Sequence, residues 1–143
     1  MIFIRQATFL AASAIFALSS VLGGCATSNF DSYTHDVVQP TVKKRMPALR
    51  ACYDQHGPKS DGNSSFKIQY VLHPDAENAR IDGINIIDKV GISAKMEKCL
   101  QKAIQTTQFR AIENGRDTEI EQSVVFKPGE WETSTNVHQG RSF

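Results

Sequence analysis

The chain lacks the sequence motifs of the common enzyme classes. It contains no G-x-S-x-G, no H-E-x-x-H and no P-loop. No acid with an expected raised pKa stands beside an ionised partner, and we interpret Asp82 and Asp88 as solvated or capping carboxylates. We therefore expect a protein that is not an enzyme and that uses no small-molecule cofactor.

Metal-ligand patterns are missing as well. The three cysteines form no C-x-x-C, and no two histidines stand at the spacing of a zinc site. The four histidines are scattered along the chain, at His35, His56, His73 and His138. We expect these histidines to be surface residues and predict no metal site.

A strong excess of charge of one sign is also absent. The formal net charge is +1 at pH 7, and without Arg5, which lies in the leader described next, the basic and acidic side chains balance. The phosphate backbone of nucleic acids attracts proteins through clustered positive charge. This composition therefore gives no electrostatic reason to expect nucleic-acid binding, and the length fits one domain.

The N-terminus carries an apolar run, residues 7–22, behind a short segment with Arg5. About 16 residues are fewer than the roughly 20 that span a bilayer as a helix, so the pattern predicts a cleaved signal peptide over residues 1–24. The ending Leu22-Gly23-Gly24-Cys25 resembles the bacterial lipobox, in which the cysteine is lipid-modified and becomes the new N-terminus. The alternative is a simple signal peptide with an incidental cysteine.

The lipobox resemblance implies where the protein resides. Cys25 would hold the chain on a membrane by acyl groups such as palmitate, and the small polar residues 25–35 would form a tether. Ala26 rather than aspartate follows the cysteine, which in lipoproteins of Gram-negative bacteria implies the outer membrane. We expect an envelope protein, anchored in the outer membrane and facing the periplasm.

Hydrophobic periodicity then predicts two helices. Pro40 opens the first, in which Val42, Met46, Leu49 and Tyr53 recur at helical spacing, and Gly57-Pro58 ends it. Pro47 predicts a kink or irregularity, and we expect the basic residues Lys43, Lys44, Arg45 and Arg50 to form a solvated face. The second helix covers residues 93–106, with Cys99 on its inward stripe.

Three strands complete the pattern. Residues 66–72 alternate cleanly, residues 79–88 change parity at Gly83 and so predict a bulge, and residues 118–127 turn Ile120, Gln122, Val124 and Phe126 to one face. Phe109 is expected to fill the core. Past Pro128 the segment 129–143 is polar, and we predict that it is mostly disordered.

Cys52 and Cys99 remain after the lipidated cysteine, and both are predicted to face inward. In an oxidising compartment two spare cysteines most simply pair, and the bridge would close a loop of about 48 residues. We predict a structural disulfide. Thiol–disulfide redox chemistry by the same two residues is the remote alternative.

The order helix, strand, strand, helix, strand and the local motifs resemble a known family. Ala48-Leu49-Arg50-Ala51-Cys52-Tyr53, then Lys98-Cys99-Leu100 and Phe109, resemble the AgmX/PglI C-terminal domain family, which is similar to the C-terminal domain of TonB. The resemblance implies an α+β domain over residues 36–128, with an αββαβ order and a three-stranded antiparallel sheet that carries two helices on one face.

TonB-like domains recognise proteins by strand addition at a sheet edge. We therefore expect a non-catalytic envelope module that binds a protein or cell-wall partner through the backbone of residues 118–127. Glu119, Glu121, Ser123 and Val125 should face away from the helices on that strand. The strand would be open on one side unless the tail folds back over it. A passive structural lipoprotein without a dedicated ligand is the alternative function.

Overall fold

The computed structural model describes residues 30–58, 62–111 and 115–140. The expected signal peptide, residues 1–24, and Cys25 lie outside these residues. The elements are η1 (Thr34–Val38), α2 (Gln39–His56), β1 (Ser64–Asp75), β2 (Asn78–Val90), α3 (Ala94–Gln105), β3 (Phe109–Arg110), β4 (Thr118–Lys127) and β5 (Glu130–Gln139). In this part of the chain no helix is long and apolar enough to cross a membrane.

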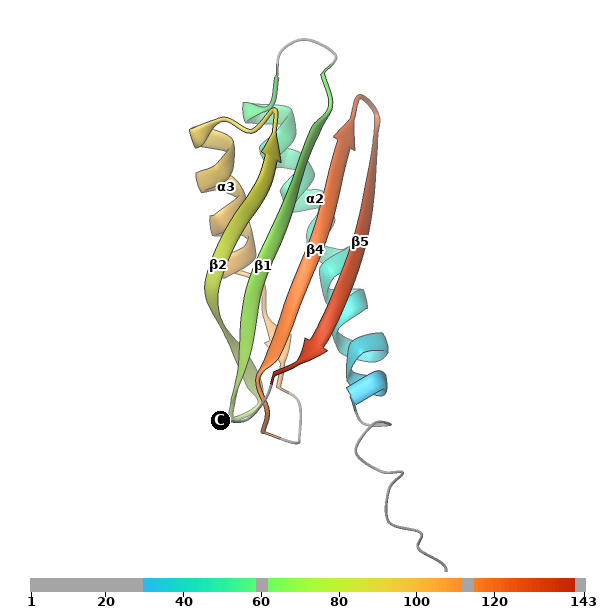
Figure 1. The fold of residues 1–143 in the computed structure, drawn as a ribbon, viewed down its shortest axis with the longest axis vertical. Coiled ribbons are helices and arrows are strands. Elements are labelled where there is room, and N and C mark those ends of the chain that lie inside the picture. Colours follow the sequence, from blue (N-terminus) through green and yellow to red (C-terminus); the bar gives the residue numbers. More distant parts are fainter. Residues whose placement is uncertain (1–29, 59–61, 112–114, 141–143) are drawn as a thin grey trace, which may run out of the picture.

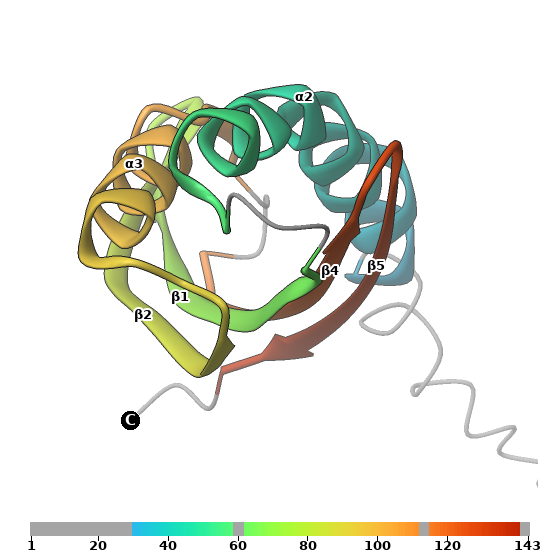
Figure 2. The ribbon, with the colours of Figure 1, turned by 90° about the horizontal axis from the view of Figure 1, so that it is seen from above.

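The described strands form one antiparallel sheet in the order β3-β2-β1-β4-β5 (Figure 1). The sheet is strongly curled, and α2 and α3 lie side by side against its concave face (Figure 2). The α+β class and the placement of two helices on one face agree with the prediction. The strand number differs, because the sheet has five strands where three were expected.

The expected disordered tail forms the fifth strand, so that prediction was wrong. Pro128 and Gly129 make a tight turn in which Gly129 takes a φ of 82°, a conformation that favours glycine. The following residues pair with β4 without a register shift, from Lys127 opposite Glu130 to Thr118 opposite Gln139. Trp131, Val137 and two threonines in this segment favour a strand despite its polarity.

The helical N-terminal region also starts earlier than expected. Residues 30–33 are already helical, so the tether cannot extend to residue 35 and the folded unit begins before residue 36. Tyr33, Val37 and Val38 are buried there. Pro40 cannot donate a hydrogen bond to the preceding turn, and the chain accommodates this with the π-helical turn η1, while α2 continues through Pro47.

The predicted inward faces are confirmed. Val42, Met46, Leu49 and Tyr53 of α2 are buried against the even-numbered residues of β1 between Phe66 and Leu72, and Phe109 is completely buried. At Gly83 the register of β2 against β1 shifts, and the residues packed against the core change from Ala79 and Ile81 to Ile84 and Ile86. The bulge therefore switches the buried parity of β2, as the sequence indicated.

A disulfide joins the two helices. Cys52 of α2 and Cys99 of α3 are bonded, with their Cα atoms 5.7 Å apart. Cys52 is 2% exposed and belongs to the core, and Cys99 is partly buried against that core. The predicted pairing is confirmed.

Candidate functional site: the sheet edges and the polar core network

The strand expected to bind a partner is not at an edge. β4 pairs with β1 on one side and with β5 on the other, along its whole length. Glu119, Glu121, Ser123 and Val125 do face away from the helices, because the alternate residues of β4 are the buried ones. The backbone of β4 is occupied on both sides, so the prediction that it pairs with a partner strand was wrong. The fold-back of the tail is the reason.

The two actual edges differ in regularity. β2 carries two register shifts against β1, and Gly83 and Asp88 near these shifts have positive φ values of 62° and 50°. β3 covers only Asn78 and Ala79 at one end of β2. Bulges of this kind twist a strand away from the geometry that another strand needs. The β2 edge is therefore protected against pairing.

The β5 edge has none of these protections. Its register with β4 is unbroken over ten residues, it contains no proline, and no other described residue pairs with its outer side. The backbone N–H of Gly140, just after β5, donates to the carbonyl of Asp117, just before β4, at 2.8 Å. In the same register, the even-numbered residues of β5 direct their backbone N–H and C=O groups toward β4. Because antiparallel strands alternate, Trp131, Thr133, Thr135 and Val137 direct their backbone N–H and C=O groups outward.

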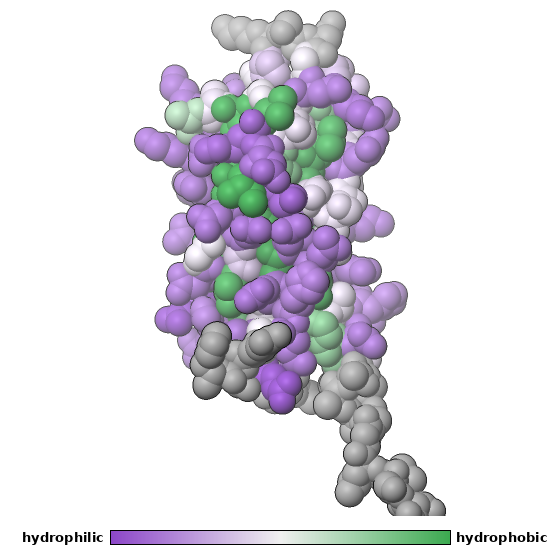
Figure 3. All heavy atoms as spheres, in the orientation of Figure 1, coloured by the Kyte–Doolittle hydropathy of each residue, from purple (hydrophilic) through white to green (hydrophobic). Residues whose placement is uncertain are grey.

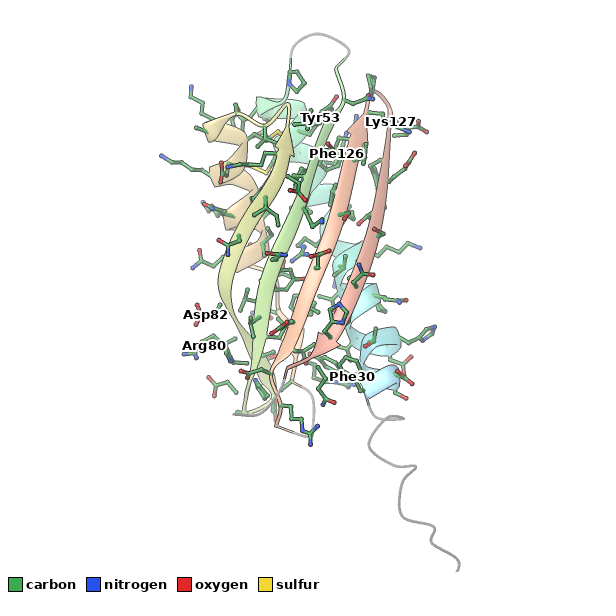
Figure 4. The ribbon with its side chains drawn as sticks, viewed as in Figure 1. Phe30, Tyr53, Arg80, Asp82, Phe126 and Lys127 are labelled. Carbon is green, nitrogen blue, oxygen red and sulfur yellow. A yellow bond between two sulfur atoms is a disulfide. The ribbon has the colours of Figure 1, made fainter. Side chains whose placement is uncertain are left out.

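One arginine fixes the hairpin that leads into this edge. The Arg50 guanidinium donates to the carbonyl oxygens of Lys127 at 2.9 Å and Glu130 at 2.7 Å. It also lies 4.9 Å from the ring centre of Tyr53 and 5.8 Å from that of Phe126. Figure 4 shows Tyr53, Phe126 and Lys127 together at this end of the sheet, with Phe30 at the other. Helix α2 thereby holds the start of β5, so Arg50 is not a free surface charge.

Arg45 was expected on the solvated face, and this prediction was wrong. Arg45 is 5% exposed, and its guanidinium donates to Gln122 Oε1 at 2.6 Å and to the Tyr70 hydroxyl at 3.1 Å. The cation lies 5.3 Å from the Tyr70 ring centre and 5.9 Å from that of Phe109. No carboxylate of the described residues pairs with it, and its Nε and Nη1 have no hydrogen-bond partner.

The polar network extends from Arg45 to the free edge. Gln122 Nε2 donates to Thr133 Oγ1 of β5 at 3.0 Å, so α2, β4 and β5 are linked through the core. Burial raises the pKa of the Tyr70 hydroxyl, while the Arg45 charge opposes that rise. The sequence held one signal of this network: Gln122 interrupts the apolar, inward-facing row of β4 and needs a buried polar partner.

The outer face of the sheet is polar and slightly hollowed. Figure 3 shows mostly hydrophilic side chains on this face, with smaller apolar patches. A depression of about 280 Å³ is lined by residues that include Gln69, Asn85, Glu119, Glu121 and His138. Gln69 already donates to Glu121 at 2.9 Å. A nearby lysine, Lys67, lies 3.2 Å from Asp88 and 3.7 Å from Glu121, and these acids raise its pKa.

A larger hollow of about 820 Å³ lies at the end of the molecule near η1. Its lining includes Tyr33, Asp36, Glu77 and Arg110. The Tyr33 hydroxyl donates to the Arg110 carbonyl at 2.8 Å, and burial raises its pKa to about 12. Among the described residues there is no group of three or more His, Cys, Asp or Glu side chains that could hold a metal ion.

Comparison with known proteins gives no relative from which a site could be transferred. No family model, no curated protein and no solved structure matches the chain. The geometry alone therefore defines the candidate site, and its most distinctive feature is the regular outer edge of β5, with which no other described residue pairs.

Proposed function

We propose that this protein is a lipid-anchored cell-envelope module that binds a protein partner by strand addition to the outer edge of β5. The observation that carries this proposal is the contrast between the two edges: β2 is interrupted by bulges, while β5 presents an unbroken, exposed strand. An extended peptide placed there gains backbone hydrogen bonds without rearrangement of the sheet. The proposed role is non-catalytic.

An anchor at Cys25 would lie close to the folded domain. Only residues 26–29 separate that cysteine from the helical start at Phe30. Even fully extended, this linker spans at most about 18 Å, so lipidation would keep the η1 end of the domain near the membrane. We propose the outer membrane, facing the periplasm, and the AgmX/PglI type of TonB-like domain, on the residues that carry those resemblances.

A pair of neighbouring proline substitutions tests the proposal. Thr135→Pro removes an outward N–H and should abolish partner binding with little change in the melting temperature. Ser134→Pro removes an N–H that bonds to β4 and should lower the melting temperature instead. Binding is measured by cross-linking in vivo and purification of the tagged full-length chain. The envelope proteins recovered with each proline variant are compared with those recovered with the unaltered chain.

The competing function is a passive structural lipoprotein. Charged residues beside an edge discourage pairing, and Glu130 and Glu132 stand at one end of β5, where both approach Lys127. That reading predicts that no envelope protein depends on Thr135. Equal recovery of every cross-linked protein by Thr135→Pro and by the unaltered chain would therefore contradict strand addition.

A further inference from the structure

The outer edge of β5 is complementary to itself. We propose that, when no partner strand occupies it, β5 pairs antiparallel with β5 of a second copy of this chain, around a two-fold axis at Ser134. This inference rests on the proposed function in one respect, since both need the β5 edge to be open. It adds the identity of an occupant, a second copy.

The backbone permits this pairing. Trp131, Thr133, Thr135 and Val137 direct their backbone groups outward, as the Gly140–Asp117 hydrogen bond shows. With the axis at Ser134, Thr133 faces Thr135 of the second copy and Trp131 faces its Val137. Each of these pairs then exchanges two backbone hydrogen bonds, and a two-fold axis makes the contact the same for both copies.

The side chains select this register. Trp131 is 39% exposed, and the pairing covers it with a β-branched valine, a favourable cross-strand combination. On the outer face Glu130 stands opposite His138 of the second copy, and Glu132 stands opposite its Asn136. Moving the second strand by two residues in either direction places Trp131 opposite Thr135 or Gln139 of the second copy. Of these three registers, only the one centred on Ser134 places Trp131 opposite Val137.

The expected dimer is reversible. A single pair of strands buries less surface than a standard stable interface. The contact should therefore depend on protein concentration, and a partner strand of higher affinity should displace the second copy. The dimer would keep the unprotected edge from pairing with unrelated proteins.

Cysteine cross-linking in the full-length chain tests the register. Ser134→Cys should form a disulfide-linked dimer, because directly opposed residues lie within the Cα separation of a disulfide. Asn136→Cys alone should stay monomeric, since its two copies lie about 13 Å apart along the strands. Glu132→Cys combined with Asn136→Cys should restore the dimer. Cys52 and Cys99 are bonded to each other and do not compete.

Two readouts separate this inference from the proposed function. The linked species are measured on non-reducing gels of envelope fractions, and Thr135→Pro added to Ser134→Cys should reduce the dimer at least tenfold. A monomeric Ser134→Cys chain, or equal linking by Asn136→Cys alone, refutes the self-pairing. If the dimer is absent while Thr135→Pro still removes an envelope partner, the self-pairing is refuted and strand addition stands. If Ser134→Cys links specifically but no envelope protein depends on Thr135, the self-pairing stands and strand addition by a partner is refuted.

Discussion

Replacing both Arg45 and Gln122 should cost less stability than replacing Gln122 alone. Arg45 is 5% exposed, Gln122 is fully buried, and the two are joined by a hydrogen bond of 2.6 Å. Gln122→Leu leaves the buried guanidinium with only the Tyr70 hydroxyl as an acceptor. Because a buried charge without partners is strongly unfavourable, we expect a loss of about 2–4 kcal/mol.

The other variants complete a double-mutant cycle. Arg45→Met removes the charge but leaves the oxygens of Gln122 and Tyr70 without their donor, for a loss of about 1–3 kcal/mol. In Arg45→Met with Gln122→Leu, an apolar pair of similar volume replaces the network. Substitutions of this kind are often neutral or stabilising, so we expect the double variant to unfold within about 1 kcal/mol of the unaltered chain, or above it.

Urea unfolding followed by circular dichroism measures the four free energies of unfolding. A matched control is Gln69→Leu, the same substitution on the outer face of β1, which we expect to change stability by less than about 1 kcal/mol. The reasoning is refuted if Gln122→Leu is as mild as this control, or if the two single losses simply add in the double variant.

Three further predictions concern the remaining features. Replacing Cys52 and Cys99 with serine should lower stability by about 4 kcal/mol in the chain-entropy model, seen as a lower melting temperature, since the bridge spans 47 residues. The pKa of Tyr33 is raised to about 12, so the contribution of its neutral hydroxyl to the free energy of unfolding is complete below about pH 10 and is lost as the pH rises through 12. The urea midpoint of unfolding should therefore fall less between pH 10 and pH 12 in Tyr33→Phe than in the unaltered chain. Mass spectrometry of the native N-terminus should find acyl groups on Cys25, and an unmodified Cys25 would contradict the anchor.

The periodic parts of the fold were predictable because each pattern has a direct physical cause. The bounds of β4 follow from strict alternation between Thr118 and Lys127, and the inward stripe of α3 follows from helical spacing. Gly83 marked the point where the buried parity of β2 changes. The disulfide followed from two inward cysteines and an inferred oxidising compartment.

The parts that were missed depend on long-range contacts. Arg45 belongs to a basic run, and only Tyr70, Phe109 and Gln122, which are distant in sequence, make its burial possible. The polarity of the segment 129–143 predicts disorder, whereas β5 needs few apolar residues because the hydrogen bonds to β4 hold it. That one strand then changed the candidate site, since it moved the free edge from β4 to β5.

The buried network of Arg45, Gln122 and Tyr70 is connected to the free edge through β5. Thr133 and Thr135 of β5 lie opposite the inward-facing Val124 and Gln122 of β4, and a strand with so few apolar residues has few contacts that could fix its register. Gln122 supplies a directional contact to Thr133, and Arg45 fixes Gln122 in turn. A buried polar network of this kind lowers stability relative to an apolar core but can specify one arrangement. If the double variant proves as stable as the unaltered chain, stability does not explain the network, and its connection to β5 points to the alignment of the outward backbone groups on which the proposed strand addition depends.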